Sequence, residues 1–150
     1  MKNQRKMIRQ IKDSDWPIVN EWNLEMASAS FDKVIPEILN KKVKEDYEKQ
    51  PEGFKVAEEN GQVVGFIWFS LIPEKKSAFI HAIYVESSFR GSGLADKLLS
   101  HVESFCKEKK IENIELNVTT KLIPAIKFYQ KKGFLIKRHF MSKNLNNESN

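Results

Sequence analysis

The sequence lacks the features that mark several classes of protein. Cys106 is its only cysteine, so an internal disulfide framework is excluded and a reducing cytoplasm is the expected compartment. No apolar run approaches the about 20 residues of a membrane-spanning helix, and the basic start over residues 1–12 contains no signal-peptide core. No Cys/His spacing suits zinc. We therefore expect a cytoplasmic protein with no metal site and no membrane partner.

Acidic residues are missing from one long stretch near the end. The chain has a formal net charge of +5, and residues 121–143 hold seven Lys or Arg side chains but no Asp or Glu. Such a basic flank can steer a phosphate-bearing ligand, or it can be a solvated face without a ligand. Because no helix-turn-helix, zinc-finger or RNA-binding strand pattern is present, a nucleic-acid partner is not expected.

Length and patterning predict one α+β domain. At 150 residues the chain can bury a substantial core, which we expect within residues 1–143, ahead of a polar tail at 144–150. Asn60-Gly61 between two apolar runs predicts a β-hairpin, because this dipeptide accepts positive φ at both turn positions. Apolar spacing predicts the other elements: strands at 7–11, 54–58, 63–70, 78–85 and 114–118, β-rich sequence at 134–143, and helices opening at 13–17, over 35–48 and from Leu94.

The stretch of residues 78–109 is typical of a strand, a glycine turn and a helix. Residues 78–85 are apolar and β-branched enough for a buried strand. Arg90-Gly91-Ser92-Gly93 follows, and an apolar stripe with helical spacing begins at Leu94. Such a turn exposes backbone N–H groups at the positive end of a helix dipole, where phosphate binds. The same pattern also arises where glycines only cap a helix.

Three phosphate-binding motifs can be compared with this turn. A Walker loop needs Gly, four residues and then Gly-Lys-Ser/Thr, a run that the chain does not contain. A dinucleotide fingerprint would use Gly91 and Gly93, but Asp96 replaces its third glycine, and Glu112 precedes the next strand instead of closing it. The remaining candidate is the pyrophosphate loop of an acyl-coenzyme A enzyme.

This turn resembles the loop of a known family, the GNAT N-acetyltransferase superfamily. The family motif is Gln/Arg-x-x-Gly-x-Gly/Ala between the fourth strand and the third helix, and Arg90, Gly93 and Ala95 match it. A second family motif follows the strand at 114–118, although Leu122 stands where the family usually has Asn. The matching positions of that second motif are Ala125, Tyr129 and the Gly133-Phe134 pair.

The resemblance implies a fold and a co-substrate. The fold is α+β: a mixed, mostly antiparallel sheet of about six to seven strands with helices on both faces and a splayed pair at strands four and five. The co-substrate is acetyl-coenzyme A, with the Val85 N–H as the expected donor to its thioester carbonyl. The residues implied to contact it are Ile83, Tyr84, Val85, Arg90, Gly91, Ser92, Gly93, Leu94, Ala95 and Phe128.

Acetyl transfer to an amine uses an acid and a base. The resemblance implies that Tyr129 is the general acid for the departing thiolate. His81 is the candidate base, because a pKa of about 6.5 suits proton removal near neutrality. It shares a face with Val85 if the strand is regular up to the bulge that this family often has in its fourth strand. Glu86 is the second candidate, and an amine already deprotonated in solution needs no base. Cys106 has no partner His at a telling spacing, so direct transfer in a ternary complex is expected.

The acceptor is the least defined part of the function. The family usually builds its acceptor pocket near the first helix break, where Trp22, Glu25, Phe31 and Asp32 offer aromatic and acidic groups suited to a cationic amine. A polyamine, an arylalkylamine, an antibiotic amine and a protein amino group are all compatible with the sequence, as is a homodimer. The alternative function is a non-catalytic module that binds acyl-coenzyme A.

Overall fold

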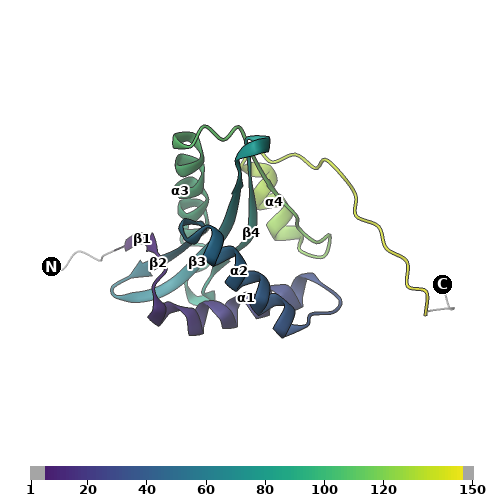
Figure 1. Cartoon of the computed structure of the whole chain (residues 1–150), viewed down its shortest axis with the longest axis horizontal. Coiled ribbons are helices and arrows are strands. Elements are labelled where there is room, and N and C mark those ends of the chain that lie inside the picture. Colours follow the sequence, from purple (N-terminus) through teal and green to yellow (C-terminus); the bar gives the residue numbers. More distant parts are fainter. Residues whose placement is uncertain (1–5, 147–150) are drawn as a thin grey trace. The chain divides into compact units, whose positions relative to one another are not determined.

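The computed structural model describes residues 6–146. The chain forms two compact units, residues 1–119 and residues 120–150. The first unit holds a β-sheet with α1, α2 and α3, and the second holds α4 (Figure 1). The single domain expected within residues 1–143 stays a prediction.

The first unit is built on a sheet of five strands in the order β1–β2–β3–β4–β5. Its first four strands pair as antiparallel neighbours, and β5 pairs with β4 in parallel. Asn60 and Gly61 form the turn between β2 and β3 with φ values of 52° and 81°, which confirms the predicted hairpin. The strands are β1 (Lys6–Gln10), β2 (Phe54–Glu59), β3 (Gln62–Ile72), β4 (Ser77–Val85) and β5 (Asn113–Leu116).

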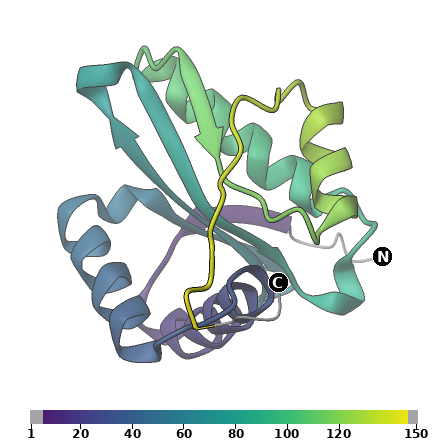
Figure 2. The same ribbon diagram turned by 90° about the vertical axis from the view of Figure 1, so that its right-hand side faces the viewer.

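Helices cover both faces of this sheet, as expected. Figure 2 shows α1 (Trp16–Ser30) and α2 (Pro36–Lys49) on one face and α3 (Leu94–Glu108) on the other. Pro17 and Pro36 lie in the first turns of α1 and α2, where a missing N–H sacrifices no helical hydrogen bond. The two faces of the sheet are therefore both buried along β3 and β4.

Aromatic rings fill the space between the sheet and the α1–α2 pair. Trp22 stacks on Tyr84 and on Phe66, with ring centroids 4.9 and 6.4 Å apart. All three side chains are buried, and fully burying such a side chain stabilises the fold by about 1.5–3 kcal/mol. On the opposite face α3 buries its predicted apolar stripe. The buried members of that stripe are Leu98, Leu99, Val102 and Cys106.

A bulge interrupts β4 at His81. Trp68 pairs with Ala82 and Phe69 pairs with Ile80, so His81 is the extra residue on β4. The imidazole stacks on Trp68 with the ring centroids 4.4 Å apart, which places it on the face that α1 and α2 cover. Side chains on a regular strand alternate between the two faces, and the bulge shifts this alternation by one residue.

The bulge changes which residues share a face with Val85. Gly65 pairs with Val85, and a Cβ on Gly65 would meet the side chains of Leu94 and Leu98 at 3.5 Å. Because directly paired residues share a face, Val85 faces α3, whereas His81 faces α2. The family resemblance implies a bulge in the fourth strand, and β4 has one. Because the bulge falls at His81 itself, the condition for a face shared with Val85 is not met.

The second unit contains α4 (Ile123–Lys131). Gly133 follows it with a φ of +97°, a left-handed conformation that suits a glycine just past a helix end. The β-rich segment expected at residues 134–143 is wrong, because those residues form no strand in the described structure. Apolar composition alone does not make a strand, since its backbone groups need a pairing partner. The described sheet accordingly has five strands instead of six to seven.

Candidate active site

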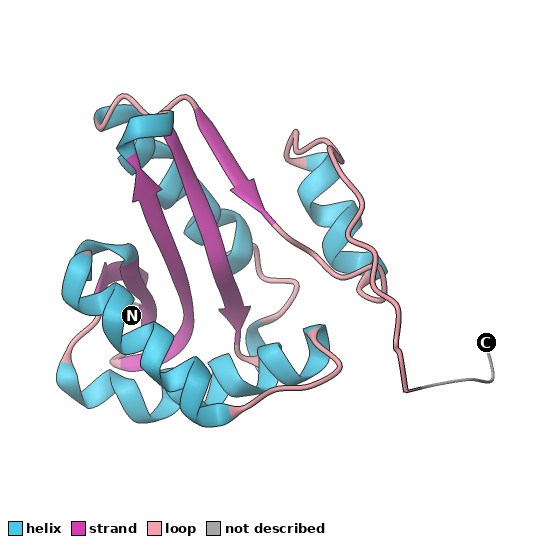
Figure 3. Ribbon diagram, turned by 45° about the vertical axis from the view of Figure 1, so that its right-hand side comes forward, coloured by secondary structure: helices cyan, strands magenta, loops and turns pink. Residues whose placement is uncertain are grey.

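The last residues of β4 present an open backbone edge. β5 pairs with β4 only over residues 77–80, and no other described strand pairs with that edge. Figure 3 shows the two strands diverging, as expected for a splayed pair. The Glu86 N–H donates to the Val64 carbonyl oxygen of β3 at 2.8 Å. Because successive residues of a strand direct their backbone groups to opposite sides, the N–H groups of Ile83 and Val85 point away from β3.

A short turn with two glycines connects this edge to α3. Gly91 and Gly93 have φ values of 82° and 86°, and a Cβ on either would meet nothing within 4 Å. The space above the turn is therefore open. Gly93 is the N-cap of α3 and brings no side chain to the first helical N–H groups. These N–H groups have no partner within a helix, so they can donate to an anion.

The residues at the turn fit a pyrophosphate group in charge and in donor type. Backbone N–H groups and the positive end of the α3 dipole favour an anion. Arg90 and Lys97 add positive charge, while Asp96 in the first turn opposes it. Glu86 is engaged locally, because its carboxylate accepts hydrogen bonds from the backbone N–H and the hydroxyl of Ser88. A capping role thus describes Glu86 better than the role of a base.

Arg90 is anchored between the turn and β4. Its Nε donates to the Val85 carbonyl oxygen at 2.9 Å, and its guanidinium lies 5.2 Å from the centroid of the Tyr84 ring. A guanidinium has five N–H donors, so an Arg90 held in this way can still form a forked pair with a phosphate. The phosphate contact of Arg90 stays a prediction.

Tyr84 points toward α1 rather than toward the open edge. Its hydroxyl donates to Glu25 Oε2 at 2.7 Å, and burial together with the Glu25 carboxylate raises the pKa of Tyr84. Tyr84 pairs with Phe66, so its backbone N–H and carbonyl face β3. The contact with acetyl-coenzyme A predicted for Tyr84 stays a prediction. Trp22, predicted to bind the acceptor, is a core residue that is only 6% exposed. Glu25, which accepts the hydrogen bond from Tyr84, is exposed.

His81 belongs to a polar cluster beneath α2. Its Nε2 lies 2.8 Å from Ser70 Oγ and 3.7 Å from Asp46 Oδ2. Lys42 Nζ donates to the other carboxylate oxygen, Asp46 Oδ1, at 3.0 Å. The sequence analysis missed Ser70, Asp46 and Lys42. The Lys42–Asp46 spacing of four residues was a usable signal for the ion pair, but nothing in the sequence placed it beside His81.

The environment of His81 keeps its imidazole neutral. Burial lowers the pKa of His81 to about 4, although the Asp46 carboxylate acts in the opposite direction. A neutral imidazole can accept a proton. Because the pKa of its conjugate acid is so low, however, His81 is a weak base near neutral pH. Asp46 Oδ2 is buried and has no hydrogen-bond partner among the described residues. A shift of that oxygen onto Nε2 would raise the pKa of His81.

Tyr129 and Phe128 lie together on α4 in the second unit. The Tyr129 ring meets Phe128 and Phe134 edge-on, with ring centroids 5.3 and 5.5 Å apart. Burial raises the pKa of Tyr129 to about 12. Its hydroxyl is therefore protonated at neutral pH, as a general acid must be. The approach of Tyr129 and Phe128 to an acetyl-coenzyme A on β4 stays a prediction.

A hollow of about 310 Å³ lies where α1 ends and α2 begins. Phe31, one of the predicted acceptor residues, is 67% exposed at its rim. Asp32 is exposed on the same loop, outside the lining. The lining residues are Ala27, Phe31, Lys33, Val34, Ile35, Ile38, Leu39 and Lys42.

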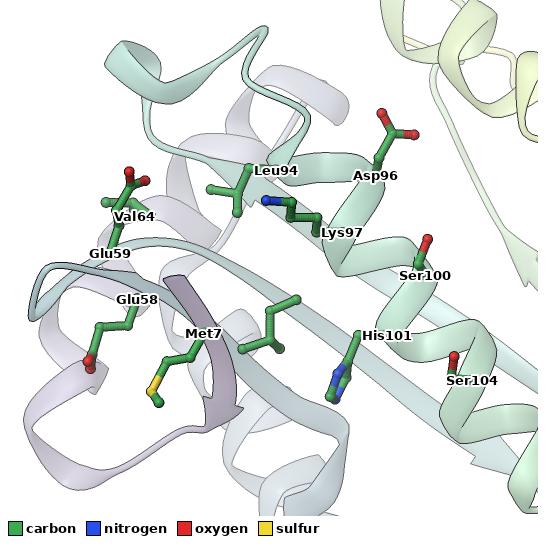
Figure 4. Close-up of a pocket in the computed structure, with 11 residues that line it drawn as sticks. Met7, Glu58, Glu59, Val64, Leu94, Asp96, Lys97, Ser100, His101 and Ser104 are labelled. Carbon is green, nitrogen blue, oxygen red and sulfur yellow. The ribbon is translucent and has the colours of Figure 1, made fainter. Parts of the chain in front are cut away.

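A second hollow, of about 510 Å³, lies between α3 and the β1–β2 edge of the sheet. Figure 4 shows Lys97 and His101 of α3 reaching toward the side of the hollow where Met7 lies. Of the predicted site residues it includes only Leu94, so it is not the predicted acetyl-coenzyme A site. Within residues 6–146 no group of three His, Cys, Asp or Glu side chains could hold a metal, and no helix is long and apolar enough to cross a membrane.

The sequence also matches a family model over most of its length. The match is to the acetyltransferase (GNAT) family and extends over residues 7–134. The chain belongs to this family. The resemblance drawn from the Arg90–Ala95 loop is thereby confirmed, and acetyl-coenzyme A is the acetyl donor of GNAT acetyltransferases.

Related GNAT proteins share part of the sequence and the fold. A protein of Methanocaldococcus jannaschii, named as an uncharacterized N-acetyltransferase, is 35% identical over 91 residues, which are 57% of this chain and 40% of its own. This GNAT chain spans about half the length of the curated relatives it matches.

Two solved structures are similar over most of both chains. Ard1 from Thermoplasma volcanium is 28% identical, with a TM-score of 0.71 over 89% of this chain and 84% of that one. Arabidopsis thaliana Naa50, in complex with the bisubstrate analogue CoA-Ac-MVNAL, is 26% identical, with a TM-score of 0.73 over 96% of this chain and 92% of that one. The GNAT fold is thus supported by structure as well as by sequence.

Proposed function

We propose that this chain is an N-acetyltransferase that moves an acetyl group from acetyl-coenzyme A to a primary amine. The observation that carries the proposal is the open edge of β4 leading into the Gly91–Gly93 turn. Ile83 and Val85 direct N–H groups outward along that edge, and the start of α3 supplies N–H groups at its end. Acetyl-coenzyme A, when bound, supplies an activated acetyl thioester. The chain supplies binding, orientation and proton transfer.

Val85 is the proposed donor to the thioester carbonyl. Its N–H is fixed in the sheet and points away from β3, and Arg90 Nε donates to the carbonyl oxygen of Val85 itself at 2.9 Å. A fixed backbone donor stabilises growing negative charge on oxygen without reorganising, and removing one such donor typically raises a barrier by about 2.7–4 kcal/mol. This role needs no side chain at position 85.

Tyr129 is the proposed general acid and His81 the proposed base. A Tyr129 pKa of about 12 keeps the phenol protonated, so it can donate a hydrogen bond to sulfur as the thiolate leaves. The low pKa of His81 makes it a weak base in the described arrangement. Closer contact with Asp46 would strengthen it, and an amine that is already neutral in solution would not need it.

Direct transfer in a ternary complex is the proposed route. Cys106, the one thiol of the chain, is buried on α3, and burial raises its pKa to about 11. A buried thiol that stays protonated is a poor nucleophile, which argues against an acyl-enzyme. The family comparisons do not favour a non-catalytic acyl-coenzyme A-binding module.

The acceptor is proposed to be a small-molecule amine or a protein amino group, and a homodimer and a cytoplasmic location stay predictions. Naa50 is described in complex with an analogue that carries a peptide, which keeps protein amino groups among the candidates. Glu25, held by Tyr84 at 2.7 Å, offers an exposed carboxylate to the ammonium form of an incoming amine.

The test is release of the coenzyme A thiol in the presence of a panel of amines. Tyr129→Phe should lower turnover far more than it weakens acetyl-coenzyme A binding. Thiol release that depends on an amine, with formation of its amide, is the expected result. Acetyl-coenzyme A binding without transfer to any amine would contradict the proposal and favour a binding module.

A further inference from the structure

Exposed apolar side chains of the first unit gather at one place. Phe31, Ile35 and Ile38 are 67%, 44% and 63% exposed and line one hollow at the end of α1 and the start of α2, and Leu24 on α1 is 36% exposed. Met7 on β1 is the one other large apolar residue exposed in the described part of this unit. Single exposed apolar residues are ordinary, but a cluster of them marks a binding surface.

The hollow within this cluster has a selective lining. Six of its eight residues are apolar, the other two are Lys33 and Lys42, and none is acidic. Its volume of about 310 Å³ equals the share of about ten water molecules in the liquid. That space accepts a group the size of one large side chain with a polar end. It lies at the lower limit of small-molecule sites.

Contacts along α2 join this hollow to the cluster around His81. Ile38, Lys42 and Asp46 follow one another at four-residue intervals, so they lie on one face of α2. Lys42 lines the hollow and donates to Asp46, and Asp46 lies 3.7 Å from His81. One helical turn, about 5.4 Å, separates Lys42 from Asp46 along the helix axis. Lys42 therefore belongs both to the lining of the hollow and to the ion pair beside His81.

We propose that the hollow selects the acceptor, and that the acceptor is a small primary amine carrying an apolar group and a carboxylate. An amino acid with a large aliphatic or aromatic side chain has this chemistry. The apolar lining takes the side chain. Lys33, together with Lys42, whose ammonium also donates to Asp46, favours a carboxylate over a second ammonium group. The inference rests on the proposed acetyltransferase function and names the substrate class for it.

The transfer balances with no further reactant. The amine nitrogen forms an amide bond to the acetyl carbon while the carbon–sulfur bond of the thioester breaks. The nitrogen loses one proton, and the sulfur leaves as the free thiol of coenzyme A. The thiol released per mole of amide formed is therefore a direct measure of transfer for every amine.

The test compares kcat/KM for amines that differ in one group. Leucine and phenylalanine carry all three groups, glycine lacks the apolar group, 3-methylbutylamine lacks the carboxylate, and spermidine carries additional ammonium groups. A peptide with an N-terminal leucine represents protein amino groups. We expect leucine or phenylalanine to exceed glycine by about tenfold or more, and to exceed each of the other amines.

Two matched variants test whether the hollow determines the preference for leucine over glycine. Ile38→Asp places a charge in the hollow, and Met7→Asp places the same charge at an exposed apolar residue outside it. Both positions are exposed, so both variants should fold. Ile38→Asp should lower kcat/KM for leucine by about tenfold or more through KM, and change kcat/KM for glycine by less than about twofold. Met7→Asp should leave both values unchanged.

The outcomes distinguish a failure of the proposed acceptor class from a failure of the proposed acetyltransferase function. Acetylation of spermidine or the peptide at rates equal to or above those of leucine would overturn the inference and keep the acetyltransferase function. Equal effects of Ile38→Asp and Met7→Asp would overturn it in the same way. If no amine in the panel were acetylated, the proposed function would fail and the inference would fall with it.

Discussion

Replacing Gly93 with alanine separates backbone strain from ligand binding. Gly93 has a φ of +86°, and Gly61 in the β2–β3 turn has a φ of +81°. At both positions a Cβ would meet nothing within 4 Å, so alanine introduces strain without a clash. Left-handed strain in a residue with a Cβ is about 1–2 kcal/mol. In a chain of this size each kcal/mol lowers Tm by about 2–4 °C, so we expect both variants to melt about 2–8 °C lower.

Only the Gly93→Ala change should weaken acetyl-coenzyme A binding. The added Cβ projects into the open space above the turn, where the pyrophosphate is proposed to lie. We expect Kd to rise by about tenfold or more, which is about 1.4 kcal/mol, while Gly61→Ala shifts it by less than about twofold. Isothermal titration measures Kd, and calorimetric melting measures Tm. Equal losses in Tm with an unchanged Kd for Gly93→Ala would refute the phosphate role of the turn.

Three further substitutions test other parts of the account. Tyr129→Phe should lower kcat by about a hundredfold with little change in acetyl-coenzyme A affinity. An unchanged kcat in thiol-release assays would show that Tyr129 is not the general acid. His81 titrates near pH 6.5 when unfolded but at about 4 when folded, so falling pH removes up to about 3 kcal/mol of stability between those values. His81→Gln should abolish that loss in urea titrations, and an equally steep loss would contradict the assignment. Arg9→Met removes the 2.7 Å partner of buried Asp15 and should destabilise the fold by about 3–5 kcal/mol; a loss below about 1 kcal/mol would argue against this ion pair.

Much of the first unit could be predicted because local rules agree with the fold there. The Asn60-Gly61 dipeptide accepts positive φ, and the two strands beside it pair as expected. The apolar stripe from Leu94 onward has helical spacing and is buried on α3. The Arg90–Ala95 loop carries a motif whose backbone geometry depends on glycine. These signals are local, so a single sequence contains them.

The missed features depend on contacts between distant residues. The family resemblance implies a bulge in the fourth strand, but its position at His81 follows from how β3 and β4 pair, and no pattern within residues 78–85 fixes that position. Asp46 reaches His81 only because α2 packs on that face. The Trp22 ring stacks in the core on Tyr84, a contact between residues 62 positions apart in the sequence, and its role in the acceptor pocket stays a prediction. In the second unit, apolar composition at residues 134–143 suggested strands that have no pairing partner among the described residues.

The most direct test of the central claim is isothermal titration of the full chain with acetyl-coenzyme A, with NAD and a short DNA duplex as controls. The account predicts selective binding of acetyl-coenzyme A at about one molecule per chain. A preference for NAD or DNA, or the absence of binding by acetyl-coenzyme A, would leave the Gly91–Gly93 turn as a helix cap and contradict the acetyltransferase assignment.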